Sequence, residues 1–158
     1  MNSLQSYDAL PYDRLPMPET EVDFLAALAS LHGFEAASAQ ACRVLELGCA
    51  QGGNLIPMAA RYPGSTFVGV DLSRKQIEEG QGMIASIGLS NIRLLHGDIA
   101  ALPNDLGTFD FIIAHGVFSW VPEFVREAMF SACSKLLGIR GVAYVSFNVS
   151  AGWRTYGR

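Results

Sequence analysis

The segment 44–54 has the sequence VLELGCAQGGN, and it decides the fold. An apolar run contains a carboxylate, Glu46, near its end and then passes into closely spaced small residues. This pattern is typical of a buried parallel strand that turns into a helix and leaves room for a ligand against the backbone, because a larger Cβ would fill that room. The fixed charge of Glu46 disfavours a phosphate beside the turn and favours a ligand that carries positive charge.

The composition indicates one globular domain. Of the 158 residues, 50% are hydrophobic and 16% are charged, and a chain of this length buries a proper core. An apolar run of about 18 residues is lacking, so we expect no membrane-spanning helix, and the first eight residues do not resemble a secretory signal. The net charge is −4 without a dense basic block, which argues against a nucleic-acid partner. We therefore expect a cytoplasmic protein.

The three cysteines do not indicate a metal site. Cys42, Cys49 and Cys133 form no CxxC pair and show no Cys/His spacing typical of metal ligands. We expect buried, reduced thiols and no bound metal. Cys49 lies in the glycine turn, but the sequence offers no partner that would activate it as a nucleophile.

Strand-like and helix-like segments alternate along the chain. The apolar runs cover 43–47, 66–70, 92–95, 109–114 and 142–149, and the helical stretches cover about 55–61, 73–87 and 122–137. This repetition predicts right-handed crossovers and a parallel sheet with helices on both faces, which is an α/β fold.

Residues 1–41 are expected to form an N-terminal arm and one helix, and residues 42–158 the core domain. Prolines and tyrosines within 1–19 favour an extended arm. Thr20 is a candidate N-cap for a helix over 21–33. The apolar face of that helix would comprise Phe24, Leu25, Leu28 and Leu31.

Two later helices have recognisable beginnings. Ser73 is a candidate N-cap with Gln76 at the capping-box position, and Pro122 suits the first position of the last helix. The inner face of that last helix would comprise Val125, Met129, Ala132 and Leu136.

Acidic residues follow two of the predicted strands, at the end where an open α/β sheet binds its ligands. Asp71 comes about 20 residues after the glycine turn, where a carboxylate can accept both hydroxyl protons of a ribose. Asp98 follows the next run, where a carboxylate can accept from the exocyclic amine of a base, and Ile99 offers an N–H and an apolar flank. The sequence therefore predicts an adenosine site.

These residues resemble the motifs of class I S-adenosylmethionine-dependent methyltransferases. The matching segments are 46–53 (ELGCAQGG), 70–72 (VDL), 97–99 (GDI) and 109–115 (FDFIIAH). Further segments resemble bacterial methyltransferases that carry a downstream methyltransferase regulatory domain, some of which methylate protein lysines; these segments are 54–58 (NLIPM), 114–122 (AHGVFSWVP), 144–148 (YVSFN) and 152–153 (GW). The resemblance covers nearly the whole chain.

The resemblance implies a Rossmann-like doubly wound sheet of order 3-2-1-4-5 and S-adenosyl-L-methionine as the cofactor. Gly48 and Gly52 would let the backbone approach the methionine half, Asp71 would hold the ribose, and Asp98 with Ile99 would hold the adenine. The cofactor-binding residues expected in full are Glu46, Gly48, Ala50, Gly52, Asn54, Asp71, Leu72, Asp98, Ile99 and His115.

Three features depart from the family pattern. Ala50 stands where the family usually has a glycine, which is tolerated if its φ stays negative. The sequence GIRG at 138–141 replaces the more usual Pro-Gly-Gly turn before the fifth strand. The chain stops at Arg158, soon after that strand, so we expect a truncated product that lacks the last two strands of the full fold. The segment 142–147 would then be an exposed apolar edge available for self-association.

Methyl transfer from a sulfonium mainly requires that the nucleophile be aligned and desolvated. A catalytic residue is therefore not specified, and His115 is only a candidate base; a packing or backbone-positioning role is the alternative. Tyr7, Tyr12, Phe118 and Trp120 are candidates for an aromatic wall near the sulfonium. Phe118 and Trp120 fit a place in the core equally well.

The acceptor is either a small molecule or a protein, with a protein lysine as one candidate. An NAD(P)-dependent oxidoreductase is a less favoured alternative, because Gly48, Ala50 and Gly53 only partly fit its fingerprint and because Glu46 and Asp98 favour the methyltransferase. A non-catalytic module that binds the cofactor or takes part in an assembly is a third hypothesis.

Overall fold

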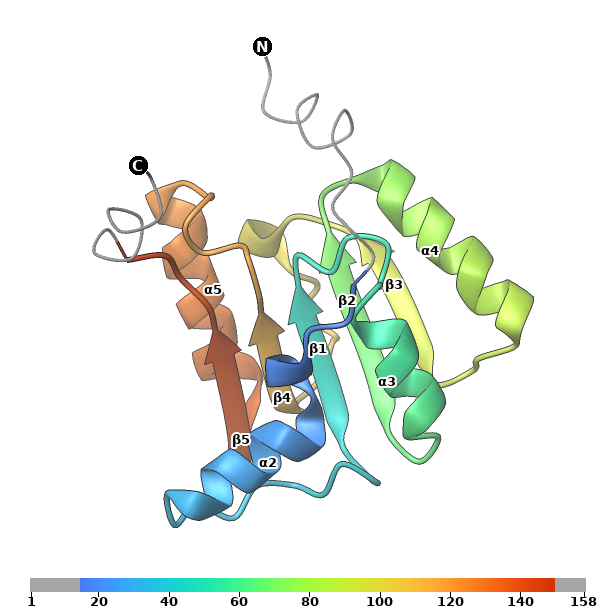
Figure 1. Ribbon diagram of the computed structural model, residues 1–158. Helices are drawn as coiled ribbons and strands as arrows, with labels where there is room; N and C mark the ends of the chain where they lie inside the picture. The colour runs from blue at the N-terminus through green and yellow to red at the C-terminus, as the bar shows by residue number, and fades with distance from the viewer. Residues whose placement is uncertain (1–14, 150–158) are drawn as a thin grey trace, which may run out of the picture.

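A computed structural model describes residues 15–149 and shows a five-stranded sheet (Figure 1). The sheet order is β3-β2-β1-β4-β5, and every neighbouring pair is parallel. The predicted α/β class and the order 3-2-1-4-5 are therefore confirmed. The strands are β1 (Arg43–Leu47), β2 (Thr66–Asp71), β3 (Ile92–His96), β4 (Phe109–Ala114) and β5 (Leu137–Val145).

Helices cover both faces of the sheet (Figure 1). One face carries α2 (Val22–Leu31), α3 (Leu55–Arg61) and α4 (Arg74–Ile87), and the other carries α5 (Glu123–Leu136) and the short 3₁₀ helix η2 (Ile99–Ala101). A second 3₁₀ helix, η1 (Pro18–Thr20), precedes α2. Within residues 15–149 we find no helix that is long and apolar enough to cross a membrane.

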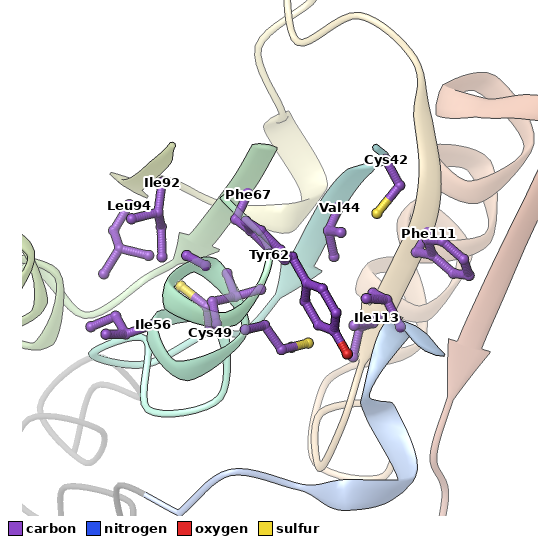
Figure 2. Packing of buried hydrophobic residues seen from close by; sticks show 14 of the residues in the cluster. Cys42, Val44, Cys49, Ile56, Tyr62, Phe67, Ile92, Leu94, Phe111 and Ile113 are labelled. Atoms are coloured by element: carbon purple, nitrogen blue, oxygen red, sulfur yellow. The ribbon is translucent and has the colours of Figure 1, made fainter. Parts of the chain in front are cut away.

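Each face of the sheet has its own apolar core, because successive side chains of a strand point to opposite faces. In β1, Val44 packs on the side of α3, whereas Leu45 and Leu47 pack on the side of α5. Figure 2 shows the first of these cores, in which Ile56 from α3 lies near side chains from the sheet. The central strands β1, β2 and β4 are buried on both faces and therefore read as nearly continuous apolar runs.

The apolar face predicted for α2 is largely wrong. Val22 and Leu25 are buried, whereas Phe24, Leu28 and Leu31 are 49%, 42% and 84% exposed. The helix places Val22, Leu25 and the small Ala26 and Ala29 on its inner side, at the helical spacing i, i+3, i+4, i+7. The larger side chains form a second stripe that faces outward. The prediction that the larger apolar residues face the core is therefore wrong for this helix.

Thr20 does not cap α2. It belongs to η1, and the N-cap residue of α2 is Glu21, which makes no side-chain capping bond. The N-cap predicted for α4 is confirmed, because the Ser73 hydroxyl accepts a hydrogen bond from the Gln76 N–H at 3.3 Å. The reciprocal bond of a capping box is not formed: the Ser73 N–H donates to Asp71 Oδ1, and Gln76 Oε1 has no partner among the described residues. Pro122 lies at the N-cap of α5, one residue before the position predicted for it.

The inner face of α5 is close to the prediction. Val125, Met129 and Ala132 are buried as expected, Leu136 is half-buried, and Cys133 joins the buried set.

The fifth strand begins five residues earlier than its hydrophobic run. The predicted turn at 138–141 lies inside β5, where the pairing with β4 shifts from Phe109–Leu137 to Phe111–Val142. Arg140 fixes this irregular stretch by donating to the carbonyls of Glu35 and Ala36, at 2.8 and 3.1 Å. These bonds to a distant loop explain why the segment is a strand although its composition is typical of a turn.

Candidate cofactor and active site

The turn after β1 has the backbone conformation that its small residues permit. Gly48 and Gly52 have φ values of +76° and +79°, which glycine adopts without steric cost. The N–H groups of Gly48 and Cys49 both donate to the carbonyl of Val70, at 2.8 and 3.2 Å. The turn is therefore fastened to the end of β2, next to Asp71.

The condition stated for Ala50, a negative φ, is not met. Its φ is +50°, and it is the only non-glycine residue with positive φ among residues 15–149. An L-residue in this region pays a steric cost between Cβ and its own backbone. The Ala50 N–H donates to Asp71 Oδ2 at 2.8 Å, and this charge-assisted bond compensates for part of that cost.

Gly48 and Gly52 are also required for close packing within the protein. A Cβ at this position would overlap the side chain of Val117, which follows β4. At Gly52 a Cβ would meet the Leu94 side chain at 3.0 Å. These glycines therefore allow the turn to approach both β3 and the loop after β4, in addition to leaving the backbone open to a ligand.

The structure brings Asp71 and Asp98 to neighbouring strand ends. Asp71 pairs with His96 in the register of β2 and β3, and the Gly97 N–H donates to the Asp71 carbonyl at 2.9 Å. The Asp71 carboxylate also accepts from the Ser73 N–H at 2.8 Å, and the exposed Asp98 accepts from the Ala100 N–H at 2.8 Å. Because each carboxylate oxygen has two lone-pair directions, both groups keep acceptor capacity for ligand hydroxyls or amines.

The predicted neighbours of these carboxylates lie at the same edge. Leu72 directly follows β2 and is 38% exposed. Ile99 is the first residue of η2 and is half-buried, where it packs against the core on the α5 side of the sheet. Both positions suit apolar contact with a flat ring.

Glu46 is a buried carboxylate with one unsatisfied oxygen. It is 4% exposed, and its Oε1 accepts a hydrogen bond from Asn54 Nδ2 at 2.9 Å. Its Oε2 is buried without a hydrogen-bond partner among the described residues. Burial raises the pKa of Glu46 to about 7; the Asn54 hydrogen bond opposes this rise and the nearby charge of Asp71 adds to it. An unpaired buried oxygen of this kind fits a cationic ligand group such as an ammonium.

Asn54 also forms hydrogen bonds with residues outside the turn. The sequence did not predict these contacts. Its Nδ2 also donates to Thr20 Oγ1 at 2.9 Å, and its Oδ1 accepts from the Met17 N–H at 3.0 Å. Thr20 and Asn54 are 34 positions apart, and neither local pattern nor spacing reveals such a contact.

His115 follows β4 and stacks on Tyr144. The ring centroids are 6.1 Å apart with an interplanar angle of 15°, and His115 Nδ1 is buried without a partner among the described residues. Burial raises the pKa of Tyr144, and the charge of Glu19 raises it further, so the hydroxyl stays neutral. Tyr144 was not among the residues predicted for the site. The role of His115 as a base stays a prediction.

The aromatic residues after β4 separate into two environments. Phe118 is half-buried and contacts Phe130 and Phe147 edge to face, at centroid distances of 5.5 and 6.2 Å. The Arg126 guanidinium lies over its ring at 5.3 Å. Trp120 is 58% exposed, so a place in the core is wrong for it. Tyr7 and Tyr12 lie outside the described residues.

The three cysteines are free thiols inside the protein. Cys42, Cys49 and Cys133 are all free and buried. Burial raises the pKa of Cys49 well above its usual value, and the charges of Glu46 and Asp71 raise it further, which disfavours a thiolate nucleophile. Over residues 15–149, no three His, Cys, Asp or Glu side chains gather as metal ligands.

A parallel sheet of this order, with a glycine turn after β1 and acidic residues after β2 and β3, defines a Rossmann-like nucleotide-binding domain. A family model described as "Methyltransferase domain" matches residues 44–141. The chain therefore belongs to this family, and its fold is that of class I S-adenosylmethionine-dependent methyltransferases.

Similar proteins occur in Rickettsia. An uncharacterised protein of Rickettsia prowazekii is 46% identical over 147 residues, which are 93% of this chain and 27% of that protein. A second one is 36% identical over 94% of this chain and 59% of its own length. The structure of PKMT2 from Rickettsia typhi in complex with AdoHcy has a TM-score of 0.87 and 36% identity, over 91% of this chain and 28% of that one. The chain thus spans only part of each of these proteins.

Proposed function

We propose that this chain binds S-adenosylmethionine at the carboxyl ends of β1 to β4 and transfers its methyl group to an acceptor beside His115. The observation that carries the proposal is the arrangement around the glycine turn: the unpaired oxygen of buried Glu46 on one side, and Asp71 with Asp98 on neighbouring strand ends. The family match and the similarity to PKMT2, which was solved with AdoHcy, support it.

In this proposal, residues at the ends of different strands bind different parts of the cofactor. Glu46 holds the ammonium, the turn residues Gly48, Ala50 and Gly52 admit the methionine backbone, and Asn54 orients Glu46. The nucleoside contacts are assigned to Asp71 for the ribose and to Leu72, Asp98 and Ile99 for the adenine. The bound cofactor supplies a methyl group on a sulfonium, and the chain's own residues align the acceptor and exclude water from it.

The acceptor we propose is a protein lysine. The resemblance to methyltransferases of this specificity supports it, and so does the surface beside His115, where Gly116 is exposed and Tyr144 half-buried. A lysine must lose its proton before it attacks, and the imidazole of His115, directly after β4, is the candidate base. The aromatic faces of His115 and Tyr144 would flank the amine.

The proposal extends to the organisation of the molecule. Residues 1–41 form an arm and helix attached to a core of 42–158, and we expect a cytoplasmic location. Among residues 15–149, β5 pairs with β4 alone, and we assign its other edge to self-association, because Ile139 in this strand is 99% exposed and an unpaired strand edge is a template for pairing.

Calorimetry with S-adenosylhomocysteine and, separately, with NAD tests the cofactor. We expect the wild type to bind S-adenosylhomocysteine, and Asp71→Ala to weaken it at least tenfold, since hydrogen bonds to a charged group contribute about 1.5–3 kcal/mol. Asp105→Ala, at an exposed position before β4, is the matched control. Binding of NAD in place of S-adenosylhomocysteine would overturn the proposal in favour of an oxidoreductase.

Mass spectrometry then tests transfer. The protein is incubated with S-adenosylmethionine and a lysine-containing peptide library, and a gain of one methyl on lysine is expected. Cofactor binding without any methylated product, in the library or in a lysate, would support the non-catalytic module instead.

A further inference from the structure

The segment that precedes α2 is attached to the glycine turn. We call residues 17–20 the strap. The strap lies in front of the sheet in Figure 1, with η1 close to β4. The Met17 N–H donates to Asn54 Oδ1 at 3.0 Å, and the Thr20 hydroxyl accepts from Asn54 Nδ2 and donates to the Met17 carbonyl, both at 2.9 Å.

Asn54 joins the strap to the buried carboxylate of the site. The two hydrogens of its amide go to Thr20 Oγ1 and to Glu46 Oε1, both at 2.9 Å, and its oxygen takes the Met17 N–H. Both of its N–H groups are therefore used, and the amide cannot rotate without breaking several bonds at once. Because Oε1 of Glu46 is fixed in this way, the direction of Oε2 is fixed as well.

The buried bonds hold the strap more strongly than the surface charges do. Thr20, Glu46 and Asn54 are 0%, 4% and 9% exposed, and hydrogen bonds shielded from water are electrostatically stronger. Arg61 of α3 also pairs with Asp23 at 3.2 Å and with Glu21 at 3.8 Å. The Arg61 side chain is 60% exposed, and exposed ion pairs contribute little. The strap is thus held mainly through Asn54.

We propose that Thr20 and Asn54 are positioning residues of the cofactor site, which couple the strap to the orientation of Glu46. This inference rests on the proposed function, in which Glu46 Oε2 accepts the cofactor's ammonium. Loss of the Thr20 hydroxyl leaves a buried N–H of Asn54 unsatisfied, and Asn54 then turns away and releases Glu46. Because coupling is reciprocal, cofactor binding at Glu46 also stabilises the strap.

Two opposite substitutions at Thr20 test the coupling. Thr20→Val keeps the size of the side chain but removes the hydroxyl, whereas Thr20→Ser keeps the hydroxyl but removes a methyl group. We expect Thr20→Val to weaken S-adenosylhomocysteine binding five- to tenfold by calorimetry and Thr20→Ser to retain the wild-type affinity within twofold. The same change at an exposed threonine, Thr66→Val at the start of β2, should have no effect.

Amide hydrogen exchange measures the stability of the strap directly. In the wild type, S-adenosylhomocysteine should slow amide exchange at Met17, Glu19 and Thr20 at least fivefold, and this protection should be lost in Thr20→Val. Unchanged affinity in Thr20→Val, or a strap whose exchange does not respond to S-adenosylhomocysteine, would overturn the inference. If the wild type binds no S-adenosylhomocysteine, the proposed function itself fails, so the two failures are distinguishable.

Discussion

Glu46 shows, for a single residue of the proposed cofactor site, how a buried carboxylate lowers the stability of the ligand-free fold. Its carboxylate is buried, one oxygen is hydrogen-bonded to Asn54 and the other has no partner among the described residues. Burying an ionised group in this way is unfavourable, which is why the pKa of Glu46 rises to about 7. A cationic ligand would reverse that cost, so the residue is unfavourable for the free fold and favourable for the complex.

This raised pKa predicts a stability that depends on pH. The folded state holds the Glu46 proton up to about pH 7, whereas the unfolded chain releases it near pH 4.5, so the free energy of unfolding falls as the pH rises between these values. The loss is on the order of 3 kcal/mol. We expect Glu46→Gln to match the wild type at pH 4 and to be about 1–3 kcal/mol more stable at pH 8, measured by urea denaturation.

Two other titratable groups, Asp71 and Cys49, lie near Glu46, and both remain in the variant, so the difference between the two proteins isolates Glu46. Glu127→Gln, at an exposed position of α5, is the control and should change stability by less than about 0.5 kcal/mol at either pH. An identical pH dependence in Glu46→Gln and wild type would contradict the assignment.

Positions 48 and 50 of the turn should respond to substitution in opposite directions. Ala50→Gly relieves the cost of a positive φ, about 1–2 kcal/mol, and loses about 0.4–1 kcal/mol through the more flexible unfolded chain, so a net gain of about 0–1.6 kcal/mol is expected. Gly48→Ala introduces a positive-φ side chain against the stiff Val117 and should lose about 1–3 kcal/mol. Thermal unfolding checks both, and a destabilised Ala50→Gly would show that the methyl group contributes packing.

At the scale of the element, the cap of α4 is the part of a helix that sequence and structure agree on most closely. The Ser73 hydroxyl accepts from the Gln76 N–H, and its loss in Ser73→Ala should cost about 1 kcal/mol. Ser86→Ala, in the same helix but exposed and bonded only to the Met83 carbonyl in its own turn, should be neutral or slightly stabilising. Chemical denaturation of both variants measures the difference, and equal effects would argue against the cap.

The predictable elements are those whose sequence signal is local. Strands β1 and β4 have the predicted bounds, because their apolar runs are buried on both faces and are followed directly by Gly48 and by His115 with Gly116. The prediction failed where distant contacts determine the structure. Arg140 holds a glycine-containing segment in β5 by bonding to a loop about 100 residues away. Helix α2 turns its smaller residues inward.

The candidate site shows the same contrast between local sequence signals and distant contacts. Asp71 and Asp98 were predictable because the carboxyl ends of parallel strands meet at one edge. The bonds from Thr20 and Met17 to Asn54 were not, because they depend on where the strap packs.

At the scale of the whole molecule, apolar side chains that the core does not use lie near one edge of the sheet. Helix α2 packs beside β5 (Figure 1), and its outward stripe of Phe24, Leu28 and Leu31 is exposed. Arg140 connects the loop after α2 to β5, and Ile139 stands next to it. The opposite edge, β3, is packed against α4. Both edge strands pack against helices, so the exposed Ile139 and the outward stripe of α2 are what lead us to propose the β5 edge for association.

If the β5 edge mediates self-association, then a charge placed on it should abolish the effect. We expect the wild type to sediment as a concentration-dependent mixture, and Ile139→Lys to sediment as a monomer, because a lysine on an edge strand opposes pairing with a second strand. Ile139 is 99% exposed, so the substitution leaves the core intact. Ile87→Lys, at a 53% exposed position at the end of α4, is the control for surface charge and should sediment as the wild type does. A monomeric wild type, or equal behaviour of the two lysine variants, would assign the exposed edge no role in association.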